Sequence, residues 1–212
     1  MLIKAFMRGN CKKYLKEYEM PESIRSFLAF DIESEAVRKK LATAQNLLAQ
    51  TGADLKLVET QNIHITIRFL GDITPATAEK IFAEMQQVQF TPFNVQIKSL
   101  GAFPDLRYPR VVWAGITEGA DQLKNVFSQL EPRLHSLGLT PDPKGFSPHL
   151  TIARVRSGRN RAQLADFVAK NANYDFGPIK AECLRLKRSD LTPRGPIYST
   201  LKEYCPRQEP KG

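Results

Sequence analysis

A short motif that occurs twice constrains the fold of this chain more than any other feature. Residues 64–67 read His-Ile-Thr-Ile, and residues 149–152 read His-Leu-Thr-Ile. In both, apolar residues alternate with His and Thr, which is the period-two pattern of a half-buried β-strand. Because successive side chains of a strand point to opposite faces, the His and Thr of each motif share one face. The fold must therefore present an imidazole beside a hydroxyl on each of two strands.

Chance does not explain this repetition well. The chain has three histidines, and Thr makes up 12 of its 212 residues. The probability that two of three histidines are followed by Thr at the second position by chance is on the order of 1%. A single His-x-Thr on a strand is usually structural. Two copies with matching apolar flanks favour a functional role.

The two residue types suit one kind of chemistry. With an unperturbed pKa near 6.5, one imidazole can act as general base while the other acts as general acid. The Thr hydroxyls can donate hydrogen bonds to two charged oxygens held between the imidazoles. A phosphodiester, with two non-bridging oxygens and attacking and leaving oxygens in line, fits this arrangement. Neither motif has the spacing of a zinc site, so we expect no metal and no cofactor.

Composition narrows the class of protein and of partner. Hydrophobic residues make up 42% and charged residues 25% of the chain, as in ordinary globular proteins. The net charge of +9 favours polyanionic partners, of which nucleic acid is the commonest, although a basic surface without function is the alternative. No apolar run is long enough to span a membrane, and the apolar stretch at residues 1–7 is too short for a signal-peptide core.

The cysteines indicate a compartment. Cys11, Cys183 and Cys205 are scattered and odd in number, which predicts free thiols in a reducing cytoplasm. We therefore expect a cytoplasmic protein. We further expect that it makes no membrane contact and functions as a monomer.

Periodicity and turn residues predict interleaved strands and helices. The expected strands are 25–32, 55–58, 62–70, 93–103, 110–117, 148–155, 177–189 and 196–204, and the expected helices are 34–50, 74–88, 121–137 and 160–172. Short loops between neighbouring strands favour antiparallel pairing, hence an α+β fold. We expect two pseudo-symmetric lobes of mainly antiparallel sheet with outer helices and the active-site cleft between them. Residues 1–19 are expected to be an N-terminal extension, 20–206 a single two-lobed domain, and 207–212 a C-terminal tail.

The paired motifs resemble those of the two-histidine (2H) phosphoesterase superfamily. Other phrases bring the chain closer to its RNA 2′,3′-cyclic phosphodiesterases, formerly called 2′-5′ RNA ligases. These phrases are His-Ile-Thr-Ile-Arg-Phe-Leu-Gly at 64–71, Val-Val-Trp-Ala-Gly at 111–115, Phe-Ser-Pro-His-Leu-Thr-Ile-Ala-Arg at 146–154, and Leu-Thr-Pro-Arg-Gly-Pro-Ile-Tyr at 191–198. The likeness covers about residues 22–204.

The resemblance implies metal-independent hydrolysis of a 2′,3′-cyclic phosphate at an RNA 3′ end to a 2′-phosphomonoester. It implies that His64 is the proton donor, that His149 is the proton acceptor, and that Thr66 and Thr151 hold the phosphate oxygens. The reverse reaction would be 2′-5′ RNA ligation. The partner is then RNA with a 2′,3′-cyclic phosphate end, for which tRNA fragments are one candidate.

Three further residues are candidates for substrate binding. Arg68 shares the His64 face by alternation, where it could contact phosphate or simply face solvent. Arg154 falls opposite His149 by alternation unless a β-bulge intervenes. Phe146 precedes the second motif, where it could stack on a base or pack within its loop.

Two alternatives stay open at this point. One is an RNA-binding module of the same fold without turnover, which the intact His and Thr residues disfavour. The other is a phosphodiesterase for a different cyclic or 2′-5′ phosphodiester, because base and sugar contacts cannot be identified from the sequence.

Overall fold

The structure is a computed structural model that describes residues 23–142, 145–193 and 195–206. The predicted extension at 1–19 and the predicted tail at 207–212 lie outside the described residues. Within the described ranges no helix is both long and apolar enough to cross a membrane.

Two antiparallel sheets form the centre of the molecule. The four-stranded sheet has the order β3-β1-β8-β9, and the five-stranded sheet has the order β2-β6-β5-β4-β7. Along the chain the elements are β1 (Ile24–Asp31), α1 (Glu35–Gln50), β2 (Leu55–Leu57), the short 3-10 helix η1 (Thr60–Asn62), β3 (His64–Ile73), α2 (Pro75–Met85), β4 (Phe93–Phe103), β5 (Val111–Ile116), α3 (Ala120–Ser136), β6 (His149–Val155), α4 (Arg161–Lys170), β7 (Asp175–Ala181), β8 (Leu184–Thr192) and β9 (Gly195–Tyr204). The predicted α+β fold with two antiparallel lobes is confirmed.

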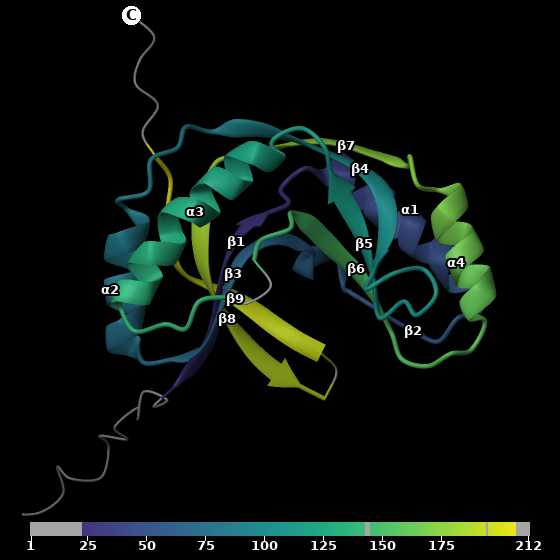
Figure 1. Ribbon diagram of the computed structural model, residues 1–212, viewed down its shortest axis with the longest axis horizontal. Helices are drawn as coiled ribbons and strands as arrows, with labels where there is room; N and C mark the ends of the chain where they lie inside the picture. The colour runs from purple at the N-terminus through teal and green to yellow at the C-terminus, as the bar shows by residue number, and fades with distance from the viewer. Residues whose placement is uncertain (1–22, 143–144, 194, 207–212) are drawn as a thin grey trace, which may run out of the picture.

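The helices cover the outer faces of the two sheets. Helices α2 and α3 contact the four-stranded sheet, whereas α1 and α4 contact the five-stranded sheet, so one pair lies at each end of the molecule (Figure 1). The apolar stripes of the helices meet the buried strand residues in a continuous core. Helix starts follow the sequence signals: the Thr74 hydroxyl accepts a hydrogen bond from the Thr77 amide, and Pro75 occupies the first turn.

The strand predicted at 177–189 is wrong, because two strands of different sheets occupy this stretch. Strand β7 pairs with β4 in the five-stranded sheet, and β8 pairs with β1 in the four-stranded sheet. The chain changes sheets at Glu182 and Cys183, where neither Gly nor Pro marks the break. Both strands are apolar in alternation, and the alternation changes phase between Ala181 and Leu184.

The prediction of free thiols is also wrong for two of the three cysteines. Cys183 and Cys205 form a disulfide with a Cα–Cα distance of 4.3 Å. They flank Leu184 and Tyr204, which are partners at the open end of the β8–β9 hairpin. The hairpin therefore brings together two cysteines that are distant in sequence. Cys11 lies outside the described residues.

Candidate active site

The two motif histidines have the same backbone hydrogen bond at the start of equivalent strands. His64 begins β3 and His149 begins β6, and these strands contact each other although they belong to different sheets. The His64 Nδ1 lies 2.8 Å from the Asn62 carbonyl, and the His149 Nδ1 lies 2.7 Å from the Ser147 carbonyl. A carbonyl can only accept, so in both rings Nδ1 carries a proton and donates. Each neutral imidazole then has a free lone pair on Nε2.

A β-bulge follows the threonine in each motif. In β3, Thr66 pairs with Ala29 and the next paired residue is Arg68, so Ile67 is the extra residue. In β6, Thr151 pairs with Trp113 and the next paired residue is Ala153, so Ile152 is extra. An extra residue shifts the alternation by one position. Residues five places after each histidine therefore return to the histidine face.

This shift places Arg154 on the face of His149 and Thr151. Its guanidinium is exposed, and its charge acts on both the His149 imidazole and the Tyr198 phenol, which lies at the other sheet. The sequence analysis made this placement conditional on a bulge, and the bulge is present. Arg154 is thus the cation of the site.

Arg68 does not share the His64 face, and that prediction is wrong because of the same shift in β3. Its side chain is 7% exposed, and its Nε donates to the Glu131 carboxylate at 2.8 Å. It also donates to the carbonyls of Phe69 and Thr140. Arg68 therefore ties β3 to α3 and to the chain that leads toward His149, and it does not face the site.

Phe146 is partly buried and packs against a helix. Its ring stacks on Phe127 of α3, with centroids 5.2 Å apart and planes at 20°. The loop-packing role, left open by the sequence, is the one that this contact supports. Phe69 takes the place on the site face that alternation gave to Arg68, and its side chain is 59% exposed.

Aromatic rings position both imidazoles. Phe27 stacks on His64 with centroids 4.7 Å apart, and Tyr198 contacts the same imidazole edge-on at 5.3 Å. Phe103 contacts His149 edge-on at 5.0 Å. These residues were not among the sequence candidates, since they lie on strands remote from the motifs. Each ring limits the rotation of the imidazole that it contacts.

Trp113 of β5 is the cross-strand partner of Thr151. Its ring lies over Gly101, where an added Cβ would come within 2.1 Å of the indole. It also contacts Phe103, so it supports the ring that holds His149. Glycine at position 101 is therefore required by this close approach.

Burial lowers the pKa of both histidines below 6.5. The pKa of His64 falls to about 4, because loss of hydration outweighs the hydrogen bond to Asn62 and the nearby Asp31 carboxylate, both of which raise it. The pKa of His149 is lowered mainly by burial and further by the Arg154 charge, against its hydrogen bond to Ser147. Both imidazoles are neutral at pH 7 in the unliganded protein.

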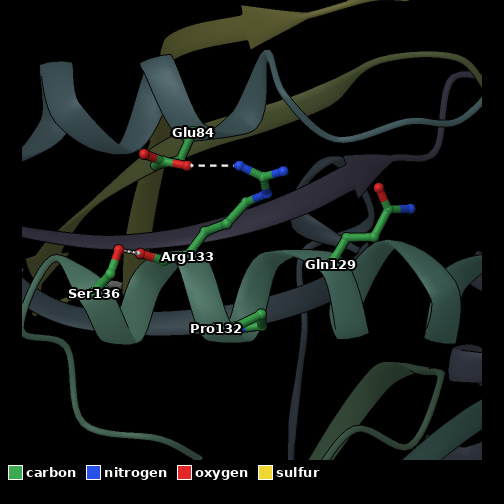
Figure 2. A pocket seen from close by; sticks show the side chains of 5 residues that line it. All are labelled: Glu84, Gln129, Pro132, Arg133 and Ser136. Atoms are coloured by element: carbon green, nitrogen blue, oxygen red, sulfur yellow. Dashed lines mark hydrogen bonds and ion pairs between the residues drawn. The ribbon is translucent and has the colours of Figure 1, made fainter.

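Two other features of the described residues do not belong to this site. Cys183, Glu203 and Cys205 cluster at metal-ligand spacing, but the disulfide removes both thiolates as ligands. A surface pocket opens between α2 and α3, where Arg133 and Glu84 form an ion pair of 3.0 Å (Figure 2). The pocket is also lined by Gln129, Pro132 and Ser136. It lies on the outer helices, away from the motif strands.

Known proteins share both the sequence pattern and the fold. The family model described as "LigT like Phosphoesterase" matches residues 32–113 and 115–198. An RNA 2′,3′-cyclic phosphodiesterase of Aeropyrum pernix is 37% identical over 77% of this chain and 93% of its own. One of Methanocaldococcus jannaschii, with the same name, is 35% identical over 85% of this chain and 100% of its own.

Solved structures have the same fold as this chain. The crystal structure of E. coli LigT complexed with 3′-AMP superposes with a TM-score of 0.72 at 20% identity, covering 88% of this chain and 100% of that one. The structure of TT0787 of Thermus thermophilus has a TM-score of 0.71 at 25% identity, covering 86% and 97%. The E. coli likeness concerns the fold alone. From the match to the family model and these relatives we conclude that the chain belongs to the LigT-like phosphoesterase family.

Proposed function

We propose that this protein hydrolyses the 2′,3′-cyclic phosphate at an RNA 3′ end to a 2′-phosphomonoester. The observation that carries the proposal is the matched pair of imidazoles, each with Nδ1 bound to a backbone carbonyl and Nε2 free. One such group can accept a proton while the other donates one. Relatives of 35–37% identity carry the name RNA 2′,3′-cyclic phosphodiesterase, which supports this substrate class.

The proposed reaction needs no group beyond the side chains of the chain and water. His149 takes a proton from water through Nε2, and the water oxygen attacks phosphorus. The bond from phosphorus to the ribose 3′ oxygen breaks, and His64 gives its proton to that oxygen. Thr66 and Thr151 donate hydrogen bonds to the non-bridging oxygens, and the Arg154 guanidinium offsets their negative charge.

The charges around the histidines support this direction of proton transfer. Asp31 is the cross-strand partner of His64, and its carboxylate favours the charged imidazolium. Arg154 lies near His149 and favours the neutral imidazole. These two charges act in the sense that the proposed roles of His64 as donor and His149 as acceptor require, while burial holds the pKa of the unliganded His64 at about 4.

Substrate binding promotes the uptake of a proton by His64, which the unliganded site lacks. With a pKa of about 4, His64 is neutral at pH 7 before substrate arrives. A phosphodiester anion beside Nε2 raises the pKa of that imidazole, because an opposite charge within a few ångströms favours the charged form. The anion thus promotes protonation of the acid that its own hydrolysis requires.

The partner and compartment follow from this substrate. RNA ends that carry cyclic phosphates, tRNA fragments among them, are the proposed partners, and the protein is proposed to act as a cytoplasmic monomer. The disulfide removes the argument from free thiols for that compartment. The cytoplasmic location therefore rests on the RNA substrate alone.

The test is turnover of a short RNA with a 2′,3′-cyclic phosphate end in the presence of EDTA. Wild type, His64→Ala and His149→Ala are compared, and the product is mapped as 2′- or 3′-phosphate. We expect a 2′-phosphate and losses of about 10²–10⁴-fold in each variant, with RNA binding retained. Binding without turnover by the wild type would favour the RNA-binding module. Turnover only of a 2′-5′-linked or other cyclic diester would move the assignment to that substrate.

A further inference from the structure

One end of the five-stranded sheet carries a group of cations that lie together and continue from the active site. Lys56 of β2 is the cross-strand partner of Arg154, so their side chains share a face. The Val155 amide donates to the Arg110 carbonyl, which joins the β4–β5 loop to the end of β6. We call the cations of segments 52–58, 104–110 and 153–161 the basic rim. It consists of Lys56, Arg107, Arg110, Arg154, Arg156, Arg159 and Arg161.

The basic rim has no ion pairs within the described residues. Only Asp54 and Asp105 are acidic in the same three segments. The Asp105 carboxylate is engaged in its own turn, where it accepts hydrogen bonds from the amides of Arg107 and Tyr108 at 2.7 and 2.9 Å. Six of the seven rim cations are exposed, and Arg161 is partly buried. Their charge is therefore available to an external anion.

Three cations of β8 in the four-stranded sheet are different, because carboxylates of the chain neutralise them. Lys187 binds Asp31 at 2.7 Å, and Arg188 binds Asp190 at 2.7 Å. Arg185 forms ion pairs with Asp31, Glu33 and Glu203. A polyanion that leaves the site over β8 meets paired charges, whereas one that leaves over the basic rim meets seven cations without ion pairs. On β1, Arg25 is a single exposed cation without an ion pair among the described residues.

An exposed aromatic ring lies among the rim cations. Tyr108 is 63% exposed, and the Arg161 guanidinium lies 4.9 Å from its ring centroid. Exposed aromatic rings within a basic groove are the platforms on which bases of single-stranded nucleic acid stack. The ring and the guanidinium together therefore suit a base and its phosphate.

We propose that the basic rim binds the RNA strand immediately upstream of the cyclic phosphate. This inference rests on the proposed function. The terminal nucleotide occupies the cleft, where Arg154 meets the phosphate. The preceding nucleotides run over Lys56 and the β4–β5 loop, with a base stacked on Tyr108. The protein thereby distinguishes an RNA end from a free cyclic nucleotide without contacting base edges.

The experiment compares two substrates and two triple variants. The substrates are a mononucleoside 2′,3′-cyclic phosphate and an RNA of about eight nucleotides with the same terminus. The rim variant is Lys56→Gln/Arg107→Gln/Arg110→Gln. The control variant is Lys39→Gln/Lys80→Gln/Lys124→Gln, whose residues lie exposed on α1, α2 and α3. Each triple lowers the formal charge from +9 to +6, so long-range attraction changes equally.

We expect the rim variant to raise KM for the RNA about 30-fold, with kcat for the RNA and both constants for the mononucleotide within about twofold of wild type. The slope of log(kcat/KM) against log salt should fall by about 2 units, since each contact with a single-strand phosphate contributes ~0.7. The control variant should change the RNA constants by less than about threefold. Tyr108→Ala should raise KM for the RNA about tenfold.

Several results would overturn the inference. Equal losses on both substrates would mark damage to the cleft, and equal losses in both triple variants would mark general charge attraction. Unchanged RNA kinetics, with loss of binding to vesicles containing phosphatidylserine, would assign the rim to a membrane. If wild type hydrolyses neither substrate, the proposed function fails. The rim is then judged by fluorescence anisotropy with a 3′-phosphate RNA, which the rim variant should still bind more weakly.

Discussion

The two halves of the active site have the same geometry and opposite charge. In both, a histidine donates through Nδ1 to the carbonyl two residues before it, and a bulge follows the threonine. The His64 half has an acidic neighbour in Asp31, whose effect on the His64 pKa exceeds the opposing effect of its ion-pair partner Lys187, and the His149 half has a basic neighbour in Arg154. Identical backbone geometry makes either imidazole able to act as acid or base. In the proposed reaction, the neighbouring charges favour His64 as the donor and His149 as the acceptor.

The two bulges also place side chains of different character on the site face. The bulge in β3 places Phe69 on the site face, and the bulge in β6 places Arg154 there. Each bulge is secured by a buried polar side chain, Arg68 beside the first and Gln45 behind the second. A repeated backbone thus presents two different side chains, an exposed aromatic ring on one side and an exposed cation on the other.

The largest expected effects distinguish the roles of Arg154 and Arg68, the two arginines of the motif strands. Arg154→Gln should lower kcat/KM about 100-fold without changing stability, because a charged contact to phosphate is lost. Arg68→Gln should lower the free energy of unfolding by about 3 kcal/mol, because Glu131 loses a buried partner, and should leave the kcat of folded protein near wild type. Urea unfolding and steady-state kinetics measure both. The reverse pattern would mean that the face assignments from the bulges are wrong.

A pH profile tests the opposite charges. The pair carries one proton between its two pKa values, so kcat/KM should be bell-shaped with a maximum between about pH 4 and 6.5, on the acid side of neutrality. Asp31→Asn removes a negative charge and should move the acidic limb to lower pH. Arg154→Gln removes a positive charge and should move the other limb to higher pH. A shift of both variants in the same direction would contradict the charge comparison.

Gln45 tests whether the second bulge needs its buried support. The Gln45 Nε2 donates to the carbonyls of Val58 and Ile152 at 2.6 and 2.8 Å. Gln45→Leu should lower the free energy of unfolding by about 1–3 kcal/mol, since buried acceptors lose a donor. The matched control is Gln122→Leu, which is exposed on α3 and is expected within about 0.5 kcal/mol of wild type. Equal stability of the two variants would show that Gln45 is dispensable.

The smallest effects should come from Thr66→Ser and Thr151→Ser. Serine keeps the hydroxyl donor and loses only the methyl group that restricts its rotation. Each variant should retain kcat/KM within about fivefold of wild type, and the two losses should match. A large loss in one half alone would show that the two threonines have different roles.

The sequence predicted the strands, the shared face of His and Thr, and the two-lobed α+β fold, because these depend on local alternation and on turn residues. Strand β4 was predicted at 93–103, the bounds that it has in the structure. The faces of Arg68 and Arg154 could not be assigned with certainty, because one extra residue inverts every side chain beyond it. Adjacent apolar residues at Ile152 and Ala153 interrupt the alternation and are the one local signal of that bulge.

Other features depended on contacts that alternation does not encode. The rings of Phe27, Phe103 and Tyr198 reach the histidines from strands far away in sequence. The disulfide required the register of β8 against β9, and the division of 177–189 into two strands required knowing which sheet each one joins. These are long-range pairings, and local pattern carries no information about them.

The route of the chain between the sheets has a mechanical consequence. Strands β1 and β3 lie in one sheet, β2 between them in sequence lies in the other, and β8 and β9 return to the first after β7. Several connections therefore cross the middle of the molecule, whereas domains that close around a ligand rotate on a few hinge residues. Opening the cleft would strain all these connections together. We therefore expect the two motif strands to keep their spacing when substrate binds.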